Sequence, residues 1–301
     1  MPSVRIALVA DIHHGADTFS KKGSAALPLL EEFRRFVADA RPDVVIDLGD
    51  RISDESREAD ARREREVADA FCPIRACVPT FHLCGNHDRD FLSVEENAAI
   101  LGQDLGHMVV DLEDWRLVLW RADTLIRRPG GFLFSEAGLA WLAETIAVAD
   151  RPLLVASHVP VSGHSQIGNH YFERNPGAAT YPQAHRVRAL LRNAAVPVLW
   201  VSGHVHWNTI TTVDGIVHLT QQSLTETFTS SGTAAGAYGL LELGPDSIDW
   251  QVHGLDALRM TLPVAPLARR WFPPLPPFDE IAGHRERHLR VETLASPIAA
   301  R

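Results

Sequence analysis

Short apolar runs alternate with amphipathic segments along most of the chain, which is the pattern of an α/β protein. Uninterrupted apolar runs predict buried strands, and apolar positions three or four residues apart predict helices. The predicted buried strands lie at 4–10, 44–48, 79–84, 153–157 and 197–202. The predicted helices lie at 25–40, 54–71, 93–102, 135–148 and 183–194. Further β-like runs lie at 108–112 and 115–120, and antiparallel strands that finish a sheet are expected at 208–220 and 237–252.

The C-terminal segment has a different composition. Six of the 19 prolines lie in 263–277, and proline is disfavoured in helix interiors and central strands. We therefore divide the chain into a domain at 1–258 and a Pro-rich arm or tail at 259–301. The arm is expected to pack along the domain or against a partner subunit, which makes a homo-oligomer one expectation. A disordered tail is the alternative.

The charge balance limits the partners. The chain has 29 basic and 38 acidic residues and a formal net charge of −9, so no broad cationic surface for nucleic acid is expected. The apolar run near the N-terminus is too short for a signal peptide or a membrane span. Three cysteines without a signal peptide favour a protein of the reducing cytoplasm. Only Lys21 and Lys22 are lysines, and we attribute this bias to a GC-rich genome. Neither lysine is expected to lie near a motif.

Each of the five predicted buried strands ends in polar residues of the types that bind metal ions. These residues are Asp11 and His13, Asp50, Asn86 and His87, His158, and His204 and His206. Ligand sites of open α/β sheets lie at the carboxyl ends of the strands, so the five clusters are expected to converge. A single histidine in such a place has an ordinary structural explanation, but five clusters together indicate a metal site.

Spacing within the clusters points to more than one ion. In an extended segment, residues i and i+2 face the same side, so Asp11 and His13 are placed to chelate one ion. His204 and His206 are placed to reach two neighbouring ions. A dinuclear centre also needs a bridging carboxylate, and Asp50 is suited to that position.

The clusters also form an ordered set of motifs. They read D-x-H at 11–13, G-D at 49–50, G-N-H-D at 85–88, a single histidine at 158, and G-H-x-H at 203–206. In this order they resemble the calcineurin-like metallophosphoesterase superfamily, over residues 4 to about 220. The resemblance implies a four-layer α/β/β/α sandwich with the metal site at one edge. In size the chain is similar to bacterial phosphodiesterases of the cyclic-nucleotide and glycerophosphodiester type.

The resemblance implies a role for each motif residue. It assigns a first metal ion to Asp11, His13 and His206, a second to Asn86, His158 and His204, and a bridging position to Asp50. His87 would face the leaving group as general acid. The catalytic candidates are therefore His87, Asp50, Asn86 and Asp88. Asp88 is expected either to orient His87 or to cap the helix that follows it.

The implied ligands determine the expected chemistry. They are nitrogen and oxygen donors without a thiolate, which suits Mn, Fe, Zn or Co. Because two divalent ions lower the pKa of bound water towards neutrality, the expected reaction is attack of a metal hydroxide on phosphorus. His87 would then protonate the leaving oxygen.

Two irregular segments, 161–181 and 221–236, are expected to form the walls of a substrate pocket. Candidate substrate contacts are Asn86, His87, His14, His164, His170 and Tyr171. The scarcity of cationic residues near the motifs favours a small phosphodiester or a cyclic nucleotide, with Tyr171, Phe172 or Trp207 as a stacking partner. A small phosphomonoester is the main alternative, and a nuclease and a non-catalytic scaffold are remote ones.

Overall fold

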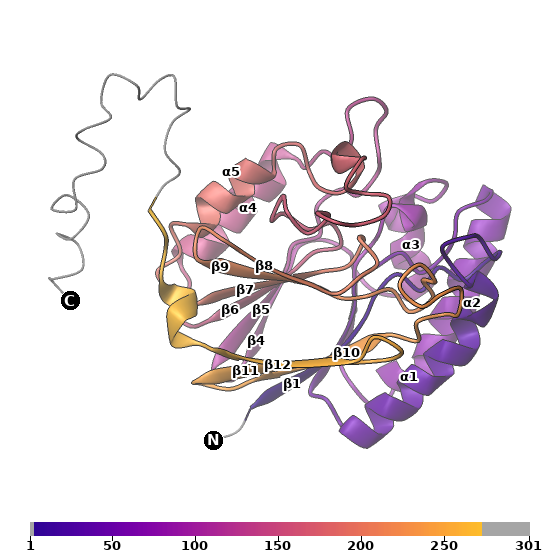
Figure 1. The fold of residues 1–301 in the computed structure, drawn as a ribbon, viewed down its shortest axis with the longest axis horizontal. Coiled ribbons are helices and arrows are strands. Elements are labelled where there is room, and N and C mark those ends of the chain that lie inside the picture. Colours follow the sequence, from indigo (N-terminus) through magenta and orange to yellow (C-terminus); the bar gives the residue numbers. More distant parts are fainter. Residues whose placement is uncertain (1–2, 273–301) are drawn as a thin grey trace, which may run out of the picture. The chain divides into compact units, whose positions relative to one another are not determined.

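The computed structural model describes residues 3–272, and their twelve strands form two six-stranded sheets (Figure 1). The first sheet, in spatial order, contains β12 (Leu258–Pro263), β11 (Ser247–His253), β10 (Tyr238–Leu243), β1 (Val4–Val9), β2 (Val44–Asp47) and β3 (Thr80–His82). The second contains β4 (Met108–Leu112), β5 (Trp115–Leu119), β6 (Leu153–Ala156), β7 (Val198–Ser202), β9 (Ile216–Thr220) and β8 (Thr209–Val213). The helices are α1 (Ala26–Ala40), α2 (Arg57–Arg75), α3 (Val94–Leu101), α4 (Glu136–Ala147) and α5 (Ala184–Leu191).

Within each sheet, the strands whose ends carry the polar clusters run parallel to one another. In the first sheet β1 pairs with β2 and β2 with β3, and in the second β5 pairs with β6 and β6 with β7. Parallel strands present their carboxyl ends at the same edge of a sheet, so each sheet gathers its own clusters at one edge.

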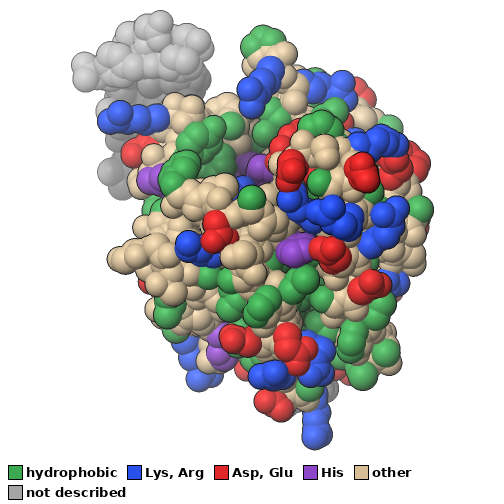
Figure 2. All heavy atoms as spheres, turned by 90° about the vertical axis from the view of Figure 1, so that its right-hand side faces the viewer, with side chains coloured by type: hydrophobic (Ala, Val, Ile, Leu, Met, Phe, Trp, Pro, Cys, Tyr) green, Lys and Arg blue, Asp and Glu red, His purple; other side chains and the backbone are tan. Residues whose placement is uncertain are grey.

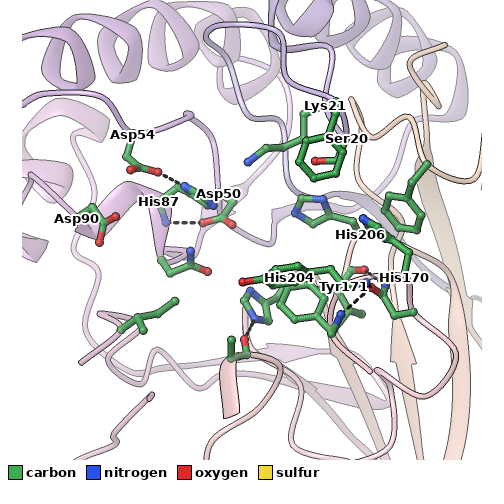
Figure 3. A pocket seen from close by; sticks show the side chains of 18 of the residues that line it. Ser20, Lys21, Asp50, Asp54, His87, Asp90, His170, Tyr171, His204 and His206 are labelled. Atoms are coloured by element: carbon green, nitrogen blue, oxygen red, sulfur yellow. Dashed lines mark hydrogen bonds and ion pairs between the residues drawn. The ribbon is translucent and has the colours of Figure 1, made fainter. Parts of the chain in front are cut away.

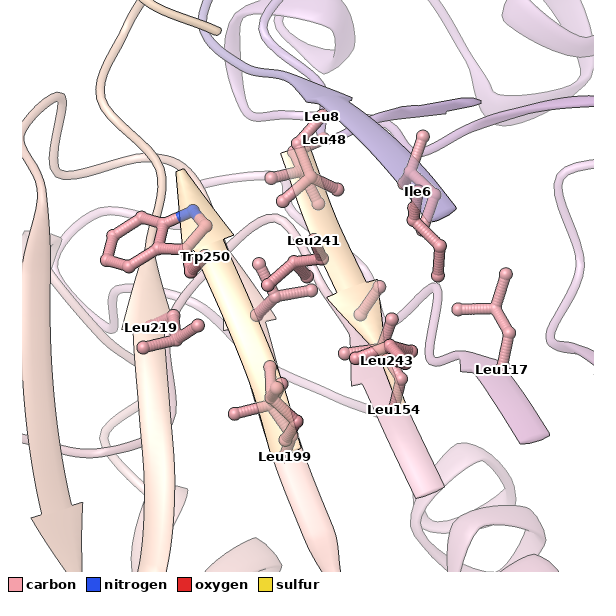
Figure 4. Packing of buried hydrophobic residues seen from close by; sticks show 14 of the residues in the cluster. Ile6, Leu8, Leu48, Leu117, Leu154, Leu199, Leu219, Leu241, Leu243 and Trp250 are labelled. Atoms are coloured by element: carbon pink, nitrogen blue, oxygen red, sulfur yellow. The ribbon is translucent and has the colours of Figure 1, made fainter. Parts of the chain in front are cut away.

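An apolar layer joins the two sheets (Figure 4). Ile6 and Leu241 of the first sheet and Leu154 and Leu199 of the second are fully buried in it. Each such side chain contributes about 1.5–3 kcal/mol through removal of its surface from water. The layer therefore fixes one sheet against the other, and with them the two sets of strand ends.

Helices cover the outer face of each sheet (Figure 1). Phe33 of α1 and Phe71 of α2 are buried against Ala7 and Val45 of the first sheet. On the second sheet, α4 and α5 pack over another buried cluster. The predicted four-layer α/β/β/α sandwich is thus confirmed, because helices cover the central strands of both sheets, while edge strands such as β4 and β8 leave outward residues exposed.

The expected boundary between residues 258 and 259 lies inside a strand. β12 pairs with β11 along its whole length, from Leu258 opposite Val252 to Pro263 opposite Ser247. Leu267, beyond this strand, is buried in the layer between the sheets. The first residues assigned to the arm therefore belong to the sheet, and Pro263 is tolerated at the end of an edge strand. The arm as a whole is expected to take part in assembly. Most of it, residues 273–301, lies outside the described residues, so this role stays a prediction.

Two expectations from composition can be compared with the structure. All three cysteines are free, as expected for a chain without a disulfide framework. Within residues 3–272, no helix combines the length and apolar character needed to cross a bilayer.

Candidate metal centre

The loops after β1, β2, β6 and β7 bring six ionisable side chains into two groups that share one carboxylate. The first group is Asp11, His13, Asp50 and His206, and the second is Asp50, His158 and His204. Within each group the donor atoms all lie within 4.8 Å of one another. The structure therefore brings together every ionisable residue that the motifs assign to metal ions, and it places Asp50 in both groups.

The distances show how closely the donor atoms approach. His13 Nε2 lies 3.0 Å from His206 Nε2, which lies 3.5 Å from Asp11 Oδ1. Asp50 Oδ2 lies 3.7 Å from His13 Nε2 and 3.5 Å from His158 Nε2, so this one oxygen faces both groups. Donor atoms that share one ion at about 2.0–2.2 Å are separated by roughly this much.

The backbone reaches this arrangement through left-handed conformations. The φ angles are 52° at Asp11, 48° at His13, 57° at Asp50, 71° at His204 and 63° at His206. The sequence analysis assumed an extended backbone at 11–13, and that assumption is wrong. Asp11 and His13 nevertheless lie in the same donor group. Positive φ is uncommon outside glycine, costs of order 1–3 kcal/mol per residue in unfavourable cases and gathers at functional sites.

Two motif glycines leave the space that the carboxylates occupy. A Cβ atom on Gly85 would lie 2.0 Å from Asp50 Oδ1, and one on Gly203 would lie 2.6 Å from Asp11 Oδ2. No larger residue fits at either position without displacing a carboxylate.

Asp88 has neither of the two roles expected for it. Its buried carboxylate accepts hydrogen bonds from the backbone N–H groups of Asp50 at 2.9 Å, Arg51 at 2.8 Å and Gly85 at 2.8 Å. The following helix, α3, is instead capped by Ser93 through a capping box. Asp88 thus holds the loop that carries Asp50.

Arg51 lies beneath the site in a buried charge network. Its guanidinium is 2.8 Å from Asp47, 2.6 Å from Glu64 and 3.2 Å from Asp88. Three carboxylates exceed one guanidinium in charge, and burial raises the pKa of Glu64 to about 8 despite the attraction of Arg51. Arg51 therefore faces the interior and does not serve the pocket.

Three buried polar atoms at the centre have no hydrogen-bond partner among residues 3–272. They are Asn86 Oδ1, His158 Nε2 and His204 Nδ1. The other ring nitrogen of each histidine donates to a backbone carbonyl, from His158 Nδ1 to Leu48 at 2.8 Å and from His204 Nε2 to Ala178 at 2.7 Å. His204 therefore keeps an unprotonated Nδ1 for the centre, whereas His158 Nε2 would be freed for a metal ion by loss of its proton. Because an unpaired buried acceptor is costly, this donor set fits a metal ion that takes all three atoms.

Burial and charge favour a cation here. Burial lowers the pKa of His204 to about 3 and holds those of His13 and His206 well below the ordinary value, so the three rings are neutral, as metal ligands must be. Burial alone would raise the pKa of Asp50, but the attraction of His158 is among the effects that outweigh it and hold the pKa well below its usual range. Burial opposes the charged form of His158, but the attraction of Asp50 raises its pKa to about 9. The ionised Asp50 carboxylate thus draws positive charge to this point, carried by His158 until a metal ion replaces its proton.

His87 lies at the pocket side of this centre with a partner that no motif revealed (Figure 3). Its Nδ1 atom donates a hydrogen bond to the carboxylate of Asp54, and its backbone N–H donates to Asp50 Oδ1 at 2.8 Å. The bond from His87 lowers the pKa of Asp54. The sequence pattern predicts a helix from residue 54, but α2 begins at Arg57, and Asp54 lies in the irregular segment before it.

A pocket of about 320 Å³ opens beside both groups (Figure 3). Four of the expected substrate contacts line it, namely Asn86, His87, His170 and Tyr171. Its aromatic lining includes Phe19, Tyr171, Phe172 and Phe228. Residues from both irregular segments therefore reach the pocket, as the sequence predicts.

Three expected contacts lie elsewhere. His14 Nε2 is 2.6 Å from the carboxylate of Glu66 on α2. His164 is exposed and outside the pocket lining, and Trp207 donates its Nε1–H to the carbonyl of Ser165 at 2.9 Å. Proximity in sequence to a motif was the only signal for His14, and it did not predict where the side chain points.

The expectation that no lysine lies near the motifs is wrong. Lys21 lines the pocket, and its Nζ atom lies 3.2 Å from His13 Nδ1 (Figure 3). Arg89, which directly follows a motif, pairs instead with Asp123 at 3.4 Å. The fold therefore brings a cation to the ligand cluster from a loop outside every motif.

The surface around α1 and α2 carries mixed charge. Figure 2 shows basic side chains interspersed with acidic ones on this side. This distribution agrees with the acidic balance of the chain.

The sequence and the fold identify the class of protein. A family model described as calcineurin-like phosphoesterase matches residues 4–208, so the chain belongs to that family of phosphoric ester hydrolases. No curated protein matches the sequence.

Among solved structures, a dimetal phosphatase from Danio rerio is 18% identical, with a TM-score of 0.65 over 87% of this chain and 99% of its own. A phosphopantetheinyl hydrolase from Mycobacterium tuberculosis is 14% identical, with a TM-score of 0.49 over 81% of this chain and 97% of its own. A phosphoesterase from E. coli is also 14% identical, with a TM-score of 0.42 over 87% of this chain and 100% of its own. At such identities, the similarity to the first of these shows a shared fold.

Gly85→Ala is expected to weaken metal binding by roughly 10–100-fold, because the added Cβ displaces the Asp50 carboxylate. Metal titration followed by elemental analysis measures the change. Gly177→Ala is the matched control, since nothing lies within 4 Å of a Cβ at that position. Unchanged metal affinity in Gly85→Ala would contradict this account of the site.

Glu64→Gln is expected to flatten the pH dependence of stability. The pKa of Glu64 rises from 4.5 to about 8 on burial, so the folded state retains a proton that the unfolded state releases at lower pH. This contribution to the free energy of unfolding is complete below about pH 4.5 and is lost as the pH rises through about 8. Urea unfolding from pH 5 to 9 should show a smaller decline in Glu64→Gln than in the wild type. Glu58→Gln, exposed on the same helix, is the control, and equal slopes in all three proteins would refute the assignment.

Proposed function

We propose that the protein is a dinuclear metal-dependent phosphodiesterase for small phosphodiesters, cyclic nucleotides included, with His87 as general acid. The observation that carries this proposal is a carboxylate, Asp50, shared by two donor groups beside an aromatic-lined pocket. Membership of the phosphoesterase family supports ester hydrolysis, and the similar fold from Danio rerio is described as a dimetal phosphatase.

The donor groups match two ions. Asp11, His13 and His206 would hold one ion, Asn86, His158 and His204 the other, and Asp50 both. Nitrogen and oxygen donors without a thiolate suit Mn, Fe or Zn. Two divalent ions bound there supply a nucleophile at neutral pH and neutralise charge that develops on the phosphoryl oxygens.

His87 supplies the proton that the leaving oxygen requires. Asp54 accepts a hydrogen bond from Nδ1, which orients the ring and leaves Nε2 as the donating atom. Phosphorus would gain the oxygen of a hydroxide ion, the bond to the leaving oxygen would break, and the proton of Nε2 would move to that oxygen. The proton that water gives up in forming hydroxide would return to His87 through solvent. Asp54 stabilises the imidazolium that is present before this transfer.

The pocket favours a substrate with an organic group beyond the phosphate. A volume of about 320 Å³ lies at the lower end of the range for small-molecule sites. Tyr171, Phe172 and Phe228 line the pocket, and their aromatic side chains would supply contact area for an organic leaving group.

One observation favours a second candidate, a phosphomonoesterase. Lys21 adds a positive charge to the pocket, and a monoester dianion gains more from it than a diester monoanion does. The two reaction types are separated by a direct comparison of esters.

The Mn²⁺-loaded protein is expected to hydrolyse bis(p-nitrophenyl) phosphate with a kcat/KM about tenfold or more above that for p-nitrophenyl phosphate. The pocket accommodates the second organic group, and that group adds binding. Chelator-treated protein is the control and should be inactive. A preference for the monoester would contradict the phosphodiesterase proposal and favour the second candidate, a phosphomonoesterase.

His87→Ala is expected to retain its metal ions and to lose about 10²–10⁴-fold in kcat. The loss should be larger for esters of alkyl alcohols than for p-nitrophenyl esters, because p-nitrophenolate departs without a proton. His164→Ala, outside the pocket, is the control. An equal loss with both leaving groups would argue against an acid role for His87.

A further inference from the structure

Lys21 occupies the pocket without a carboxylate partner. Among residues 3–272, its Nζ atom has one polar contact, the ring nitrogen Nδ1 of His13 at 3.2 Å. The neighbouring Lys22, by contrast, pairs with Asp17 at 3.4 Å. Figure 3 shows the Lys21 side chain extending into the pocket, towards the centre that contains Asp50.

The backbone around Lys21 is held in place from both sides. The carbonyl of Ser20 accepts a hydrogen bond from Thr227 N–H at 2.9 Å, and Lys22 N–H donates to the carbonyl of Thr225 at 2.8 Å. Lys21 itself forms a β-bridge with Glu226. The ammonium group is thus delivered to the pocket by a fixed segment, with only the side chain free to adjust.

Charge balance indicates what this ammonium binds. Asp50, Asp54 and Asp11 attract it, but divalent ions held by His13 and its neighbours would offset their negative charge. The ammonium would then be repelled by the ions unless a further anion lies between them. Lysine carries a compact point charge suited to a phosphate oxygen. A diester phosphate has two non-bridging oxygens, whereas a monoester has a third and one more negative charge.

We propose that Lys21 is a specificity-determining residue that binds a non-bridging oxygen of the phosphate and favours dianionic over monoanionic phosphates. This inference rests on the proposed function, because it assumes metal ions at the Asp50 centre. It assigns to one side chain a contribution, beyond that of the metal ions, to the affinity of this site for phosphomonoesters and inorganic phosphate.

Four Mn²⁺-loaded proteins test the proposal: wild type, Lys21→Gln, Lys21→Arg and Lys22→Gln. Calorimetry measures binding of inorganic phosphate, elemental analysis gives the metal content, and kcat/KM is measured for p-nitrophenyl phosphate and its bis-ester. We expect Lys21→Gln to weaken phosphate binding about tenfold or more, the loss of one charge-assisted hydrogen bond. Its kcat/KM should fall about tenfold further for the monoester than for the diester. Lys21→Arg should retain part of the affinity, and Lys22→Gln all of it.

The proposal is overturned if Lys21→Gln binds phosphate as the wild type does, if Lys22→Gln loses as much, or if both esters lose activity equally. A lower metal content in Lys21→Gln also overturns it, since Lys21 would then act by positioning His13. If the wild type binds phosphate through Lys21 but hydrolyses neither ester, the proposed function fails and the role of Lys21 stands. If the wild type hydrolyses esters but Lys21→Gln binds phosphate normally, the proposed function stands and the role of Lys21 fails.

Discussion

The buried carboxylate of Asp88 is the interaction on which the rest of the site depends. By accepting N–H groups from Asp50, Arg51 and Gly85, it ties the loop after β2 to the loop after β3. Arg51 compensates its charge and extends the network to α2 through Glu64. Removal of one partner from such a buried network leaves an uncompensated charge, which typically costs about 3–5 kcal/mol. The position of Asp50 between the two donor groups is therefore secured by residues that do not themselves line the pocket.

The same arrangement explains how an acidic chain can attract a phosphate. An ionised Asp50 in a buried site favours positive charge at one point, whereas the net charge of the whole chain is −9. Bound cations are commonly the largest local charges in a site, so local potential at the centre outweighs the distant acidic surface. The pocket adds Lys21 to this positive region, and aromatic rings also line it.

The sequence predicted the parts of the site that follow from strand periodicity. Buried strands with polar ends locate Asp11, Asp50, His158 and His204, because parallel strands must present these ends at one edge. The functional side chains that it missed, Asp54 and Lys21, lie in irregular loops whose path is set by tertiary contacts. The same limit explains why His14 turns to Glu66 and why the hydrogen bonds of Asp88 go to backbone groups. The left-handed backbone of His13 and His206 likewise has no signature in residue types.

The most direct test of the central claim is the location of the metal ions. Crystals grown with Mn²⁺ and measured at its absorption edge should show two anomalous peaks in each chain. One should lie among Asp11, His13 and His206, the other among Asn86, His158 and His204, and both should contact Asp50. A single peak, or two peaks of which only one contacts Asp50, would contradict a dinuclear centre built around a shared carboxylate.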